Sequence, residues 1–232
     1  NKKHKNAILA KKFAKATHAL APQSHTANTP VIGTSGATVS GKKLATVDDI
    51  INLSGAMSAA GIPDDKIFLL IAYGAHRLQT EAESRAEFGD EVVDRVRIEH
   101  SSGINPDSKF RHLGETSHGV PIEINELALD ADRLILTGAI ISHLLAGFGA
   151  GRKAVLPGIS SYQTIQRNHC LCLRDEIGTG IKPEIVSGNL KTNLMHQDQM
   201  EHGAAADADF LVNVVANTHG QPAQFVCGHW EK

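Results

Sequence analysis

Two histidines and a lysine surround one glycine-rich stretch of the sequence. His143 precedes the stretch 147–153, Lys153 closes it, and His169 follows. A lysine whose stem lies along small residues can carry a covalent group, and imidazoles can bind a metal or transfer protons near neutral pH. The segment is therefore predicted to be the centre of a reactive site.

Another histidine lies after a predicted buried strand. The apolar run 67–72 has the length of a strand that is buried on both faces of a parallel sheet, and His76 comes just past its end. Residues 80–83 (Thr-Glu-Ala-Glu) form a potential capping box that opens a helix ending at Gly89. Taken alone, His76 could be a general base or a histidine that only hydrogen-bonds its loop.

The same order of elements recurs later in the chain. Residues 133–138 are expected to form a strand, His143 follows it, and Ser160 or Ser161 can cap a helix that runs through His169. Ligands of open α/β sheets bind beyond the carboxyl ends of the strands. The predicted fold is α/β, a mostly parallel sheet flanked by helices, with His76 and His143 facing one crevice.

The chain of 232 residues is 41% hydrophobic, which suffices for a sizeable core. Residues 1–45 are interpreted as an N-terminal segment and loop region. The lysines near its start are interpreted as a solvated helix face; the alternatives are a basic amphipathic helix and an exported leader. Residues 46–232 are interpreted as an α/β cofactor-binding domain, which begins with a helix capped by Thr46 and also contains a strand at 208–216.

Composition narrows the function classes. The net charge of −2 and the lack of a long apolar run favour neither nucleic acid nor a membrane as partner. Three cysteines are too few for a disulfide framework, which suits a cytoplasmic protein. Cys170 and Cys172 lie beside His169, but their spacing is not typical of a zinc site. The glycine-rich stretch fits neither a P-loop nor a dinucleotide fingerprint.

The segment 142–169 resembles the signature of the nickel-dependent lactate racemase family, the nickel-pincer-nucleotide enzymes. The block 72–81 resembles a second family block. Further similar segments extend the resemblance over roughly residues 65 to 228; they are 89–93, 131–135, 193–196 and 210–215.

The resemblance implies a role for each reactive residue. His76 and His143 match the two catalytic bases, one for each enantiomer of a 2-hydroxy acid. Lys153 matches the lysine that tethers a pyridinium mononucleotide by a thioamide, with Gly151 and Arg152 beside it in the cofactor site. His169 matches the nickel ligand. Without the resemblance, a capped or buried histidine remains an alternative for His143 and a helix cap for His169.

The substrate contacts are less well matched. Arg77 could bind a carboxylate bidentately or be a solvated charge. Lys43 lies where many members have an Asp-x-Thr-Arg-Pro block, and it lacks the planar fork of arginine. Family members continue into a second α/β domain, so the chain is expected to be the N-terminal catalytic domain of a normally two-domain enzyme, whose C-terminal domain is separate or missing.

The predicted function is a racemase or epimerase of a small-molecule 2-hydroxy acid, such as lactate. It would use hydride transfer to a lysine-tethered nickel-pincer nucleotide. The alternative is a non-catalytic module that binds the cofactor or nickel.

Overall fold

The structure is a computed structural model that describes residues 61–176, 178–217 and 222–231, together with the backbone of three short strands at 31–35, 38–39 and 42–43. The predicted helix after Thr46 and the lysine-rich start of the chain lie outside the described residues. No helix among the described residues is long and apolar enough to cross a membrane.

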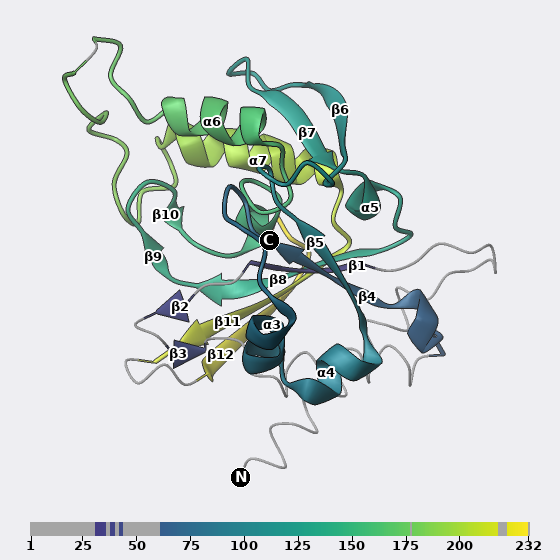
Figure 1. Cartoon of the computed structure of the whole chain (residues 1–232). Coiled ribbons are helices and arrows are strands. Elements are labelled where there is room, and N and C mark those ends of the chain that lie inside the picture. Colours follow the sequence, from purple (N-terminus) through teal and green to yellow (C-terminus); the bar gives the residue numbers. More distant parts are fainter. Residues whose placement is uncertain are drawn as a thin grey trace.

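A six-stranded sheet forms the centre of the molecule (Figure 1). Its order is β12-β11-β8-β1-β4-β5, and every neighbouring pair is parallel except β11 and β12. This confirms the predicted mostly parallel sheet. The strands are β1 (Val31–Ser35), β4 (Phe68–Ala72), β5 (Arg97–Ser101), β8 (Leu134–Ile140), β11 (Phe210–Ala216) and β12 (Pro222–Gly228).

The apolar runs form strands because both of their faces are covered. All five residues of β4 are buried, so alternate side chains enter separate cores. Leu70 and Leu136 pack on one face, whereas Leu69 and Ile135 pack on the other. A strand that is apolar at every position can bury the side chains of both faces only within a sheet that is covered on both sides.

Two short helices pack on one face of the sheet, and four other helical segments lie on the opposite side (Figure 1). Phe88 and Val92 join the core on the first face. The first pair is α3 (Glu81–Phe88) and α4 (Asp90–Arg95); the others are α5 (Glu126–Leu129), α6 (Tyr162–Cys170), α7 (Leu194–Ala206) and the 3-10 helix η2 (Gly151–Ala154).

Smaller elements complete the described part of the chain. A hairpin of β6 (Phe110–Glu115) and β7 (Pro121–Asn125) lies against α6 and α7, and a shorter one joins β9 (Ser142–His143) to β10 (Gly147–Phe148). The strands β2 (Thr38–Val39) and β3 (Lys42–Lys43) pair, and the 3-10 helix η1 (Asp64–Lys66) precedes β4.

The predicted elements around the site are confirmed with small shifts. Thr80 and Glu83 form a complete capping box for α3, and Gly89 ends that helix. Ser161, not Ser160, caps α6. The strand β1 comes from within the predicted N-terminal segment, so the division between residues 45 and 46 does not follow the edge of the sheet; as a domain boundary it stays a prediction.

Candidate active site

A cavity of about 220 Å³ opens at the carboxyl ends of the central strands. Four of the predicted reactive residues line it: His76, His143, Lys153 and His169. They come from four separate segments, namely the loop after β4, the strand β9, η2 and α6. The structure therefore brings together side chains that span nearly a hundred residues of sequence. The other lining residues are Ala72, Tyr73, Gly74, Ala75, Ile141, Gly149, Ala150, Pro157, Gly158 and Ile165.

His76 is placed by hydrogen bonds of its own loop. Its backbone N–H donates to the carbonyl of Tyr73, and its carbonyl accepts from Ser102 Oγ at 2.6 Å. Gly74 has a φ of +61°, which favours glycine, and its N–H donates to the carbonyl of Gly158. These contacts fix the turn after β4 against the segment that follows Lys153, and they leave the His76 side chain exposed at the cavity.

Lys153 lies in a tightly packed turn. A Cβ on Gly158 would lie only 2.1 Å from the carbonyl oxygen of Ala154, so only glycine fits there. Ala150 precedes η2 with φ 66° and ψ −175°, a region that residues other than glycine rarely adopt. Such backbone conformations concentrate at functional sites, where the surrounding structure holds them in place.

His169 is oriented by its own helix. Its Nδ1 lies 2.7 Å from the carbonyl oxygen of Ile165, one turn earlier in α6. Because a carbonyl can only accept, Nδ1 carries the proton and Nε2 keeps its lone pair. A backbone carbonyl on the other ring nitrogen is the usual support of a metal-binding imidazole.

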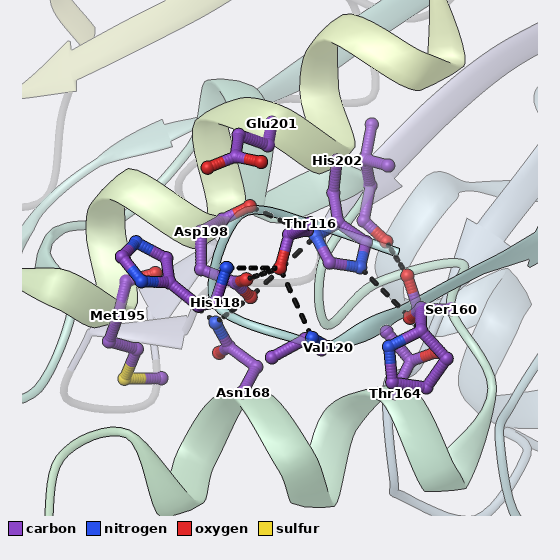
Figure 2. Close-up of polar contacts among 12 residues, drawn as sticks. Thr116, His118, Val120, Ser160, Thr164, Asn168, Met195, Asp198, Glu201 and His202 are labelled. Carbon is purple, nitrogen blue, oxygen red and sulfur yellow. Dashed lines mark hydrogen bonds and ion pairs between the residues drawn. The ribbon is translucent and has the colours of Figure 1, made fainter. Parts of the chain in front are cut away.

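The helix that carries His169 is held by a buried polar network (Figure 2). Asp198 of α7 accepts from Thr116 Oγ1 at 2.6 Å and from Asn168 Nδ2 at 2.7 Å, and its side chain is fully buried. Asn168 also donates to the carbonyl of Met195. The residue next to His169 is therefore anchored to α7 and to the β6–β7 hairpin, which fixes the rotation of α6 about its axis.

The cavity disfavours positive charge on its basic groups. Burial, together with the charge of Arg152, lowers the pKa of Lys153 to about 8. Burial also lowers the pKa of His143, as do the charges of Lys153, His169 and Arg152. The pKa of His169 is lowered mainly by burial. The two imidazoles are thus favoured in their neutral form near neutral pH, and the Lys153 amine becomes largely neutral at mildly alkaline pH.

Three other predicted residues do not line this cavity. Arg77 makes a bidentate ion pair with Glu83, at 2.6 and 2.8 Å, and its side chain is 70% exposed. Arg152 is buried and donates to the carbonyls of Ala146 and Phe148. Gly151 begins η2 with a φ of +56°. Their substrate and cofactor roles stay predictions.

Lys43 lies in β3, and its side chain is outside the described part of the structure. Its predicted contact with the substrate therefore also stays a prediction.

Tyr73 lines the cavity although the sequence analysis did not select it. Its hydroxyl lies 2.8 Å from His100 Nδ1, and burial raises the pKa of Tyr73 to about 12. The sequence signal that could have selected Tyr73 is its position between the buried strand and His76. The hydroxyl contacts His100 and Gln79, neither of which lines the cavity, so it is the ring of Tyr73 that is held in place beside the site.

Among the described residues, no three His, Cys, Asp or Glu side chains gather into a metal-binding group. Cys170 is exposed and Cys172 is buried, both as free thiols. The nickel site that the family resemblance implies, with His169 as its protein ligand, stays a prediction.

Comparison with known proteins identifies the family. Residues 17–180 match the lactate racemase N-terminal domain. The chain belongs to the lactate racemase N-terminal domain family. Lactate racemases from Lactiplantibacillus plantarum and Thermoanaerobacterium thermosaccharolyticum are 39% identical over 155 residues and 36% identical over 166 residues. These segments cover 66% and 71% of this chain but 34% and 37% of the relatives, so the chain spans about a third of their length.

A solved lactate racemase structure agrees with this family, and a second solved structure shares the fold. The lactate racemase apoprotein from Thermoanaerobacterium thermosaccharolyticum superposes with a TM-score of 0.77 and 27% identity, over 98% of this chain and 52% of that one. A protein from Thermotoga maritima shares the fold, with a TM-score of 0.69 and 17% identity over 96% of this chain and 55% of its own.

Proposed function

We propose that this chain forms the cofactor-bearing part of a racemase or epimerase that acts on lactate or a similar 2-hydroxy acid. The observation that carries the proposal is the meeting of His76, His143, Lys153 and His169 in one cavity. The family relatives are named lactate racemases, and the residues that meet here are those that the family resemblance selects.

The cavity residues fit a lysine-tethered nickel-pincer nucleotide. A Lys153 amine with its pKa near 8 is largely neutral at mildly alkaline pH, as acylation requires. His169 offers Nε2 as a ligand, since Nδ1 donates to the helix backbone. Gly149 and Gly158 keep the wall free of side chains at two positions. When bound, the group would supply a metal centre and a hydride acceptor.

In this proposal the protein itself moves the hydroxyl proton. One of His76 and His143 accepts that proton from the starting enantiomer, and the other donates a proton as the opposite enantiomer forms, so each direction uses both. Two imidazoles are needed because the hydroxyl of each enantiomer is approached from a different side. Burial lowers the pKa of His143, which favours its neutral imidazole at neutral pH.

Racemisation by a protein that also contains the region found in the longer relatives tests the proposal. Replacing His76 or His143 by Ala should slow both directions by about 10²–10⁴-fold, since general acid–base help is of this size. Hydrogen isotope at C2 should stay on the substrate. Washout into solvent would contradict hydride transfer, and a wild type that binds cofactor but racemises no 2-hydroxy acid would establish the non-catalytic module instead.

A further inference from the structure

The imidazole of His143 is held by the turn that follows it. Its Nδ1 accepts from the backbone N–H of Leu145 at 3.2 Å and from that of Ala146 at 3.1 Å. A backbone N–H can only donate, so the Nδ1 lone pair is engaged and the single proton of the neutral ring resides on Nε2. Burial lowers the pKa of His143, so the neutral ring is the relevant form.

Two buried side chains, Asn193 and Arg152, donate hydrogen bonds to backbone carbonyls of this turn. Asn193, fully buried, donates through Nδ2 to the carbonyl of Leu145 at 2.8 Å. That carbonyl belongs to the same planar peptide unit as the N–H of Ala146, which points the opposite way, toward His143. Asn193 therefore binds the carbonyl of this peptide unit, and His143 Nδ1 accepts from the N–H of the same unit.

Arg152 holds the next part of the turn. Its Nη2 donates to the carbonyl of Ala146 at 2.7 Å and to that of Phe148 at 3.1 Å. The side chain is only 8% exposed, and it forms no ion pair within the described residues. Burial lowers the pKa of Arg152 to about 10. Burying a cation against carbonyls is costly, and in this position the guanidinium joins two carbonyls of the turn.

We propose that Asn193 and Arg152 are positioning residues for His143: they hold the turn so that its N–H groups fix the imidazole with the proton on Nε2. The ring then begins as a hydrogen-bond donor at Nε2. Before Nε2 can accept a proton, the ring must give up two backbone hydrogen bonds, so these residues control when His143 becomes a base. The importance of this control rests on the proposed function, whereas the tautomer itself does not.

The histidine tautomers can be read from long-range ¹H–¹⁵N correlation spectra of the ¹⁵N-labelled chain, without cofactor or substrate. The His143 signals are assigned by their loss in His143→Gln. The wild type should show Nδ1 as the unprotonated nitrogen and Nε2 as the protonated one. A ring with its proton on Nδ1, or an even mixture of the two forms, would overturn the proposal whether or not the enzyme racemises lactate.

Asn193→Ser tests the positioning role. Asn193 also caps α7 by accepting from the N–H of His196, and serine keeps that cap while losing the Nδ2 donor. Loss of one hydrogen bond should raise the minor tautomer of His143 about fivefold.

Asn125→Ser is the matched control. Asn125 is equally buried, caps α5, and donates through Nδ2 to Ser101, away from the turn. Unchanged His143 signals in Asn193→Ser, or the same change in both variants, would refute the positioning role. If Asn193→Ser does not fold, as judged by circular dichroism, Arg152→Met carries the same expectation and the same refutation.

Discussion

Replacing Lys153 by methionine should stabilise the protein at neutral pH. The pKa of Lys153 is lowered from 10.5 to about 8, mainly because burial penalises its charged form. Each unit of pKa difference corresponds to about 1.4 kcal/mol, so protonated Lys153 costs the folded state about 3 kcal/mol. Methionine has a similar length and no charge, so Lys153→Met should raise the free energy of unfolding at pH 7 by up to about that amount.

The pH dependence gives this prediction its sign. At pH 7 and below the amine is mostly protonated in both states and the penalty is nearly complete. Between about pH 8 and 10.5 the folded state releases its proton before the unfolded state does, so the wild type regains stability relative to the variant. The gap between the two proteins should therefore narrow by about 2.5 kcal/mol between pH 7 and pH 10.

Urea unfolding of both proteins at several pH values provides the measurement. Lys191→Met is the control, because Lys191 is exposed and surface substitutions usually change stability by less than about 0.5 kcal/mol. A Lys153→Met variant that is less stable than the wild type at pH 7, or a gap that does not change with pH, would show that Lys153 is not a buried amine with a lowered pKa.

Two further predictions concern α6. Asp198→Ala should lower the free energy of unfolding by about 3 kcal/mol in urea titrations, because Thr116 and Asn168 lose a buried acceptor; a change below about 1 kcal/mol would mean that the network does not anchor the helix. His169→Ala should lower the nickel content of the cofactor-loaded protein, measured by elemental analysis, without unfolding it. His112→Ala, at an exposed site, should keep its nickel, and equal metal in both variants would remove His169 from the metal site.

The sequence was sufficient for elements whose signals are local. The run at 67–72 and the capping box at Thr80 predicted β4 and α3, and strand-end histidines predicted that His76 and His143 would share one crevice. These succeed because burial on two faces and helix capping leave patterns within a few residues. The glycine-rich stretch had already singled out Lys153 and His169, and the family resemblance then gave each of them a role.

Features that depend on distant partners were not predictable in this way. The strand β1 is a central strand, although its Val-Ile-Gly-Thr-Ser sequence among Gly and Pro residues indicated only a loop or a broken strand. Thr116 meets Asp198 across 82 residues, which no periodicity reveals. Arg77 was expected either to bind a substrate carboxylate or to be a solvated charge, and its pairing with Glu83 of α3 could not be read from the sequence; its substrate role stays a prediction. A charged side chain alone does not show which partner it will contact.

The central claim is that Lys153 carries a cofactor in the cavity that it shares with His76, His143 and His169. Intact-mass and peptide-mapping spectrometry of the protein, purified from a nickel-fed host that makes the pincer nucleotide, tests it most directly. We predict a mass increment of cofactor size on the peptide that contains Lys153, which disappears in Lys153→Arg. An unmodified chain from that host, or an increment on a different lysine, would contradict the account.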